Sequence, residues 1–186
     1  MYLAAFRDGS VKVGTSTQRR SQQRLEEQGA WIAHYVAVAD NGFAVRDLED
    51  RVTADLGLTQ AVNASRKVRG LLNPVADERL TETLERHRRS VHELMVAGVD
   101  SVASMDKTWR HPMADHPAVA KLYPYPTKLT SGGHDLELVT AVGRTAIARR
   151  PGTDDAFPID LGPVFGLQLE MGGAVSDEIA IQDSLF

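Results

Sequence analysis

The sequence has no cysteine among its 186 residues, which excludes disulfides, thiolate nucleophiles and cysteine-bound zinc. It also lacks any apolar run near the roughly 20 residues that a membrane span needs, and no charged start followed by an apolar stretch opens it. We therefore expect a cytoplasmic protein without membrane contact. The 42% apolar and 25% charged residues are ordinary values that exclude wholesale disorder and fibrous classes.

A strong excess of one charge sign is lacking as well. The 21 basic and 25 acidic residues give a net charge of −4, which is weak evidence against a protein that coats nucleic acid. The distribution is uneven, because residues 1–72 carry a net charge of +2 and residues 73–186 a net charge of −6. Most of the basic residues are arginine, which suits bidentate contacts with carboxylate or phosphate groups. A local anionic ligand on the N-terminal part is consistent with this pattern.

The first 72 residues predict a regular order of elements. Apolar periodicity and turn residues indicate a hairpin at 1–6 and 11–13, a helix at 18–28, a strand at 30–39, a helix at 43–56 and a short helix at 64–72. Ser16 or Thr17 is placed to cap the first helix, and Gly29 and Gly57 are placed to end the two longer ones.

The rest of the chain predicts a long amphipathic helix at 76–98, ended by Gly98, and a β-rich tail. We expect residues 99–135 to be irregular, because several of them precede prolines and are pushed away from helical geometry. Four tail strands are expected, at 136–142, 145–149, 157–161 and 164–169. The predicted fold class is α+β, with parts at 1–72, at 73–122 (a helical connector and loop) and at 123–186 (a β-rich C-terminal unit).

Tyr2 lies in the first predicted strand, and the second strand is Val11-Lys12-Val13-Gly14. After them come a helix with Arg20 and Arg24, a strand, and a helix with Glu49. This order resembles the GIY-YIG nuclease superfamily, whose two short strands carry the named tripeptides. There the next helix carries an arginine, and a later helix carries a metal-binding glutamate. Within that superfamily the chain is similar to the uncharacterised bacterial domain-of-unknown-function 2797 family. Three stretches carry this closer likeness: 11–15 with 27–30, 123–128 and 142–149.

The resemblance implies a small mixed sheet with flanking helices and a divalent-metal-dependent phosphodiesterase, nuclease or DNA-binding protein. In that reading Glu49 holds Mg²⁺ or Mn²⁺, Arg24 neutralises the phosphate, and Tyr2 or Lys12 deprotonates the attacking water. Lys12 stands where the superfamily has the tyrosine of its second tripeptide. A lysine does acid–base work at neutral pH only if burial or a nearby cation lowers its pKa.

Polar residues around these four are candidate substrate-binding groups: Thr15, Ser16, Arg20, Gln28 and Asn63. Arg20 and Arg24 lie four positions apart on one helix face, where two guanidinium groups would form a compact anion site. Each candidate also has an ordinary alternative. In that alternative the two arginines pair with acids such as Glu27, and the other four residues serve as helix caps, turn residues or helix ends.

Three other ideas stay open at this stage. His111, His116 and His134, with Asp115 and Asp135 next to two of them, would suit zinc in principle, but they lack a helical metal-ligand spacing. The net acidic charge and Lys12 favour a metal-independent enzyme that acts on a small anionic metabolite at the same site. A non-catalytic binding or assembly module is the third alternative.

Overall fold

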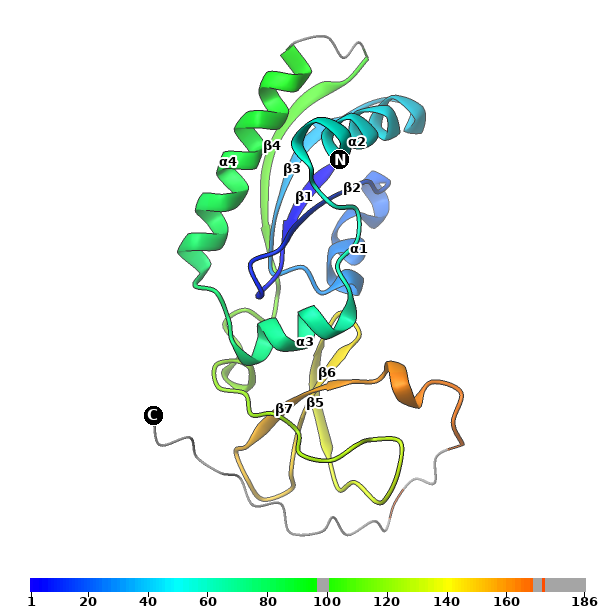
Figure 1. The fold of residues 1–186 in the computed structure, drawn as a ribbon, viewed down its shortest axis with the longest axis vertical. Coiled ribbons are helices and arrows are strands. Elements are labelled where there is room, and N and C mark those ends of the chain that lie inside the picture. The colour runs from blue at the N-terminus through cyan, green and yellow to red at the C-terminus, as the bar shows by residue number, and fades with distance from the viewer. Residues whose placement is uncertain (97–100, 169–171, 173–186) are drawn as a thin grey trace.

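The computed structural model describes residues 1–96, 101–168 and 172, and it shows an α+β fold, as the sequence predicts. A four-stranded sheet in the order β2-β1-β3-β4 carries helices on both faces, and a smaller sheet in the order β5-β6-β7 lies beyond α3 (Figure 1). Every ladder between these strands is antiparallel, and the parallel pairing found in the described part is the single bridge between Lys12 and Thr59. Within the described ranges, no helix has the length and apolar character to cross a membrane.

The predicted hairpin is confirmed; its first strand is central in the larger sheet and its second strand is at the edge. The strands are β1 (Tyr2–Ala5), β2 (Val11–Gly14) and β3 (Ile32–Val38), and β1 pairs with both neighbours. Gly9 has a φ of +84°, which glycine adopts without strain, and the Asp8 carboxylate accepts the Ser10 amide to close the turn. Because β1 is central, all its side chains are buried.

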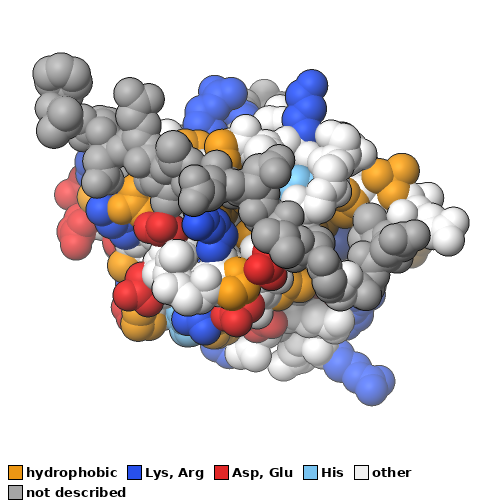
Figure 2. All heavy atoms as spheres, turned by 90° about the horizontal axis from the view of Figure 1, so that it is seen from below, with side chains coloured by type: hydrophobic (Ala, Val, Ile, Leu, Met, Phe, Trp, Pro, Cys, Tyr) orange, Lys and Arg blue, Asp and Glu red, His pale blue; other side chains and the backbone are white. Residues whose placement is uncertain are grey.

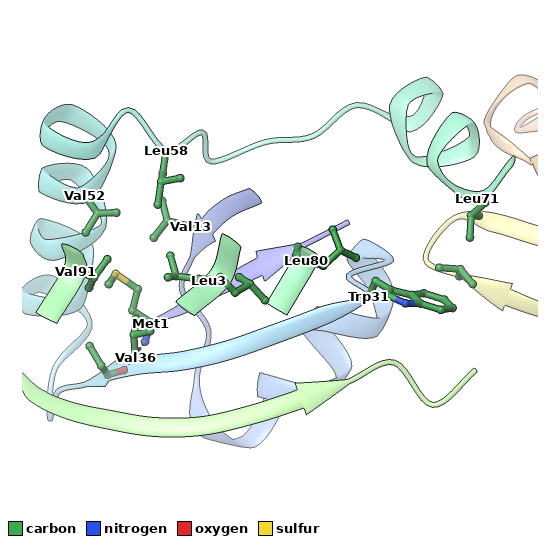
Figure 3. Packing of buried hydrophobic residues seen from close by; sticks show 14 of the residues in the cluster. Met1, Leu3, Val13, Trp31, Val36, Val52, Leu58, Leu71, Leu80 and Val91 are labelled. Atoms are coloured by element: carbon green, nitrogen blue, oxygen red, sulfur yellow. Dashed lines mark hydrogen bonds between the residues drawn. The ribbon is translucent and has the colours of Figure 1, made fainter. Parts of the chain in front are cut away.

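Alternate side chains of the larger sheet form two separate cores, as the period of a strand requires. Leu3, Val13 and Val36 point to the face that α2 and α4 cover, where they pack with residues such as Val52 and Val91 (Figure 3). The opposite face is covered by α1. There Leu25 packs with aromatic and small residues of the strands: Tyr2, Ala4, Phe6, Ala33 and Tyr35.

The helices fall close to their predicted positions: α1 (Ser21–Gln28), α2 (Gly42–Leu56), α3 (Ala64–Leu72) and α4 (Asp77–Val96). Gly29 and Gly57 end α1 and α2 in left-handed conformations, as expected. Residues 18–20 form a 3₁₀ turn, η1 (Gln18–Arg20), instead of the start of an α-helix, and the Thr17 side chain makes no capping hydrogen bond. The expected end of the fourth helix at Gly98 lies outside the described residues.

The prediction that residues 99–135 are irregular is wrong for one long segment. Residues Ala103–Arg110 form β4, which pairs with β3 at the edge of the larger sheet. The strand was missed because its side chains are mostly polar and exposed, with only Met105 and Trp109 half-buried against the α1 face. An edge strand with one solvated face lacks the apolar content that identifies a central strand. A short 3₁₀ turn, η2 (Pro117–Val119), follows it.

The C-terminal unit contains three of the four predicted strands: β5 (Glu137–Val142), β6 (Thr145–Arg149) and β7 (Ala156–Asp160). The fourth strand, expected at 164–169, is wrong for the residues that are described. Residues 162–164 form a 3₁₀ turn, η3 (Gly162–Val164), and turns follow. Pro163, the residue just before the expected strand, lies in η3, where the fixed φ of proline suits the first turn of a helix. Residue 169 lies outside the described ranges.

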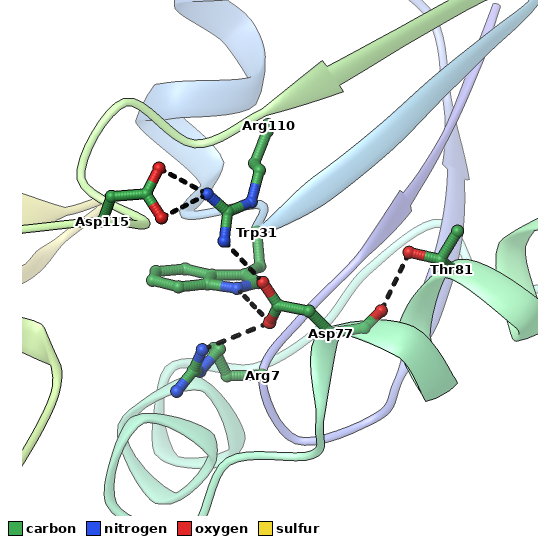
Figure 4. A network of polar contacts seen from close by, with 6 residues as sticks. All are labelled: Arg7, Trp31, Asp77, Thr81, Arg110 and Asp115. Atoms are coloured by element: carbon green, nitrogen blue, oxygen red, sulfur yellow. Dashed lines mark hydrogen bonds and ion pairs between the residues drawn. The ribbon is translucent and has the colours of Figure 1, made fainter.

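A network around Asp77, at the start of α4, joins several elements of the larger sheet (Figure 4). One Asp77 oxygen accepts the Trp31 indole N–H at 2.8 Å and lies 3.4 Å from the Arg7 guanidinium. The other lies 2.8 Å from Arg110, which also forms a bidentate pair with Asp115. The Arg7 guanidinium also lies 4.3 Å from the centre of the Trp31 ring. Because of the ion pairs given above, every charge in this Asp77 network has an opposite charge as a neighbour.

Candidate functional site

Lys12 is a lysine whose side chain is almost completely buried in the sheet. It pairs with Ala4 across the β1–β2 ladder and therefore lies on the α1 face, together with Tyr2. Only 8% of Lys12 is exposed, and its ammonium Nζ donates to the Gln60 main-chain oxygen at 3.1 Å. No ion pair joins Lys12 to a carboxylate among the described residues. A buried ammonium whose one protein partner is a carbonyl is an expensive arrangement unless something else compensates for it.

Tyr2 and Gln28 lie together on the α1 face. The Tyr2 hydroxyl donates to Gln28 Oε1 at 3.1 Å, and the amide nitrogen of Gln28 is buried without an acceptor. Gly14 makes room for this ring, because a Cβ at that position would lie 2.5 Å from the Tyr2 hydroxyl oxygen. Burial raises the pKa of Tyr2, and the Gln28 hydrogen bond and the Arg24 guanidinium oppose that shift. Tyr2 is therefore a neutral group at neutral pH, close to Arg24.

Cations surround Lys12 and change its proton affinity. Burial is the largest cause that lowers the pKa of the Lys12 ammonium, to about 8, and the positive charges of Lys67 and Arg24 lower it further. Glu49 opposes this shift. Arg24, on α1, and Glu49, on α2, come from helices on opposite faces of the sheet, and the charges of both act on Lys12.

Lys67, on α3, is the second lysine at this place. Its ammonium Nζ donates to the main-chain oxygen of Gln28 at 2.7 Å and lies 5.0 Å from the centre of the Phe6 ring. Burial lowers its pKa, the Arg144 cation adds to that effect, and Asp8 opposes it. We refer to Tyr2, Lys12, Arg24, Gln28 and Lys67 as the Lys12 cluster.

Glu49, on α2, is a carboxylate whose charge acts on Lys12. Its Oε2 oxygen already has two partners. Its side chain is 5% exposed, and Oε2 accepts the Thr15 hydroxyl at 3.2 Å and lies 3.3 Å from the Arg46 guanidinium. No group of three or more metal-ligating side chains occurs in the part of the chain that is described. One carboxylate held by an arginine, with Lys12 and Arg24 nearby, does not fit a divalent cation, which needs several oxygen ligands and little positive charge around it.

The remaining predicted residues lie at three other places. Arg20 forms an exposed ion pair with Glu27 at 3.0 Å, so it does not join Arg24. Asn63 caps α3 by accepting the Arg66 amide at 2.9 Å. Thr15 and Ser16 line a cavity of about 790 Å³ between η1, β3, β4 and the start of α2.

The histidines of the alternative metal site do not converge among the described residues. His111 Nδ1 accepts the Met113 amide at 3.1 Å, and burial lowers the pKa of His111 to about 4. His116 Nδ1 accepts the Ala118 amide at 3.2 Å. His134 contacts the Tyr125 hydroxyl at 2.8 Å, in the C-terminal unit. Each ring therefore makes its own local hydrogen bond.

Burial without an ion pair separates Lys12 and Lys67 from exposed basic residues such as Arg79 and Lys107, which also have no carboxylate partner in the described part of the chain. Arginines throughout the fold have carboxylate partners within 4 Å: Arg7, Arg20, Arg46, Arg66, Arg88, Arg110 and Arg149. Lys12, Arg24 and Lys67 have none among the described residues, although Lys12 is buried and Lys67 is half-buried. The cluster is thus a set of buried and surface donors without a carboxylate ion pair among the described residues.

Sequence reasoning identified Tyr2, Lys12, Arg24 and Gln28 but missed Lys67. The contact between Lys67 and Gln28 joins residues 39 positions apart and depends on how α3 packs beside α1, which no local spacing reports. Comparisons with protein-family models, with curated proteins and with solved structures find no match to this chain. Its site is therefore interpreted from the geometry.

Proposed function

We propose that the Lys12 cluster binds the anionic group of a small molecule, and that Lys12 exchanges a proton with this ligand without the help of a metal ion. The observation that carries this proposal is the buried Lys12 ammonium, which has cations as neighbours and no carboxylate ion pair among the described residues. Burying such a charge is costly, and a bound anion offsets the cost by Coulomb attraction and by accepting hydrogen bonds.

The donors of the cluster suit an anionic ligand. Lys12 and Lys67 supply ammonium groups, Arg24 a guanidinium, and Gln28 an amide nitrogen that lacks an acceptor. Tyr2 is a positioning residue here, since its hydroxyl donates to Gln28 and lies beside Arg24. A Lys12 pKa of about 8 leaves both protonation states accessible near neutral pH, which general acid–base catalysis requires.

A small ligand fits these features better than a nucleic-acid duplex. The chain has a net charge of −4, and Figure 2 shows basic, acidic and apolar side chains interspersed over the described part of the end of the molecule that it views. A duplex is bound by many phosphate contacts along a basic surface. Lys12 is only 8% exposed and suits a group that enters the protein.

A direct test measures the binding of inorganic phosphate by isothermal titration calorimetry, with the wild type, Lys12→Met and Lys128→Met. Methionine keeps the length of the side chain without its charge, and Lys128 is an exposed lysine of the C-terminal unit. We expect Lys12→Met to weaken binding by at least about tenfold, the effect of losing one charged hydrogen bond. Lys128→Met should bind like the wild type. Equal binding by all three proteins would overturn the proposal.

A second candidate function is the phosphodiesterase or nuclease chemistry implied by the resemblance to the GIY-YIG superfamily. One observation favours it: Arg24 and Glu49 both lie within electrostatic reach of Tyr2 and Lys12. The Glu49→Gln variant separates the candidates. A metal-dependent nuclease would cleave branched, nicked or single-stranded DNA with Mg²⁺ or Mn²⁺ and would lose that activity in Glu49→Gln. The anion site we propose keeps its phosphate affinity within about threefold in this variant, because Glu49 is not a ligand of the anion.

A further inference from the structure

Two glycines, Gly143 and Gly29, allow the turn between β5 and β6 to contact the end of α1. Gly143 has a φ of +62°, and a Cβ at this position would lie 2.6 Å from the Gly29 nitrogen and 3.0 Å from the Gln28 carbonyl carbon. Two main chains approach this closely only where neither carries a side chain. The C-terminal unit therefore contacts the same peptide group whose oxygen accepts the Lys67 ammonium.

This contact places Arg144, the residue after Gly143, beside the Lys12 cluster. Arg144 is exposed, and its cation acts on Lys67 strongly enough to lower the pKa of that lysine. The Arg144 Nη2 lies 3.1 Å from the position that a Cβ of Gly162 would take, near Asp160, whose carboxylate accepts the Gly162 amide. No ion pair joins Arg144 to Asp160 or to another carboxylate in the described part of the chain.

Resting on the function proposed above, we propose that the site accepts a molecule with two phosphate groups, the first at Lys12 and Arg24 and the second at Lys67 and Arg144. Arg144 then belongs to the binding site, although it comes from the C-terminal unit. A planar guanidinium suits bidentate contact with phosphate, and the fixed Lys67 ammonium adds a point charge beside it. The four cations of the two pairs exceed the carboxylates of Glu49, Asp8 and Asp160 that act on them or lie beside them, which leaves positive charge for an anionic ligand.

The test compares inorganic phosphate and inorganic pyrophosphate as calorimetric probes. The wild type should bind pyrophosphate at least about tenfold more tightly than phosphate, because the second group gains its own charged hydrogen bonds. Arg144→Gln should reduce the pyrophosphate affinity to nearly that of phosphate and leave the phosphate affinity within about twofold. The matched control is Arg149→Gln, which removes an exposed arginine of the same hairpin that pairs with Glu137 at 2.9 Å. It should change neither affinity.

The outcomes separate this inference from the proposed function. Lys12-dependent phosphate binding without a preference for pyrophosphate overturns the inference alone, as does an equal loss in Arg144→Gln and Arg149→Gln. If neither anion binds to the wild type, both proposals fail. Thermal melting checks that the variants fold. Should Arg144→Gln fail to fold, Lys67→Gln replaces it, because it removes the other cation at the second phosphate and should abolish the same preference.

Discussion

The Asp77 network and the Lys12 cluster both contain basic side chains, but the partners of these side chains differ. In the network, Arg7 and Arg110 share the two oxygens of Asp77, which also accepts the Trp31 indole. In the cluster, Lys12 has only a main-chain carbonyl as its protein partner among the described residues. The comparison teaches that a cation's role is better read from its counter-ion and its burial than from its type: the paired group stabilises the fold, and the buried unpaired group is the one that we propose binds an anion.

The largest expected effect comes from breaking the paired side of this comparison. Asp77→Ala leaves the half-buried Arg7 without its carboxylate, and the Trp31 and Arg110 donors each lose an acceptor. We expect the free energy of unfolding to fall by about 4 kcal/mol, in the range for removing one partner of a buried ion pair. Urea denaturation measures it.

The matched control for Asp77→Ala is Glu137→Ala, which breaks the exposed pair with Arg149. Its cost should stay below about 1 kcal/mol, as for other surface pairs. Equal costs for the two variants would contradict the structural role that we assign to the Asp77 network.

The buried Lys12, without an ion pair among the described residues, predicts that the free energy of unfolding depends on pH. Because the folded pKa of Lys12 is lowered from 10.5 to about 8, the folded state loses this proton before the unfolded state does. The unfolded chain therefore binds more protons between pH 8 and pH 10.5, and stability due to Lys12 rises with pH across this window. Relative to Lys12→Met, the wild type should gain at most about 3 kcal/mol from pH 7.5 to pH 10.5. Denaturation at both pH values measures this, and a flat difference would contradict it.

An effect of similar size tests the contact between the two parts of the fold. Gly143→Ala forces a side chain into a left-handed residue and against the Gly29 main chain, so we expect a loss of about 3 kcal/mol. Gly152→Ala is its matched control, with a φ of +75° and nothing within 4 Å of the new Cβ. It should lose only the conformational part, about 1 kcal/mol. Similar melting temperatures for the two variants would show that the Gly29–Gly143 contact does not hold the C-terminal unit.

The elements of the larger sheet could largely be predicted from the sequence, since local signals fix them. The Asp8-Gly9 turn, the buried first strand and the glycines that end α1 and α2 are all properties of neighbouring residues. Strand β4 could not be identified this way, because its stability comes from pairing with β3 and from few apolar contacts of its own. Its place at the edge of the sheet is a tertiary property.

The candidate site was predictable in part for the same reason. Tyr2 and Lys12 share a face once the hairpin register is known, and Gln28 lies at the end of the helix that covers this face. Lys67 and Arg144 come from later elements, and their positions follow from packing between α1, α3 and the β5–β6 turn. A residue's counter-ion is likewise not given by its spacing: Arg20 and Arg24 are four positions apart, yet Arg20 lies in η1, before α1, and only Arg20 of the two has an acidic partner, Glu27, among the residues described.

The most direct test of the account is the pKa of the Lys12 ammonium, measured by NMR on protein labelled at lysine, without and with saturating sulfate. Sulfate resembles phosphate but does not titrate in the relevant range. The account predicts a pKa of about 8 in the free protein and a higher value with sulfate, because a bound anion favours the charged form. A Lys12 pKa near the ordinary 10.5 in the protein without sulfate, or a low pKa that sulfate leaves unchanged, would contradict the proposal that this lysine binds an anion.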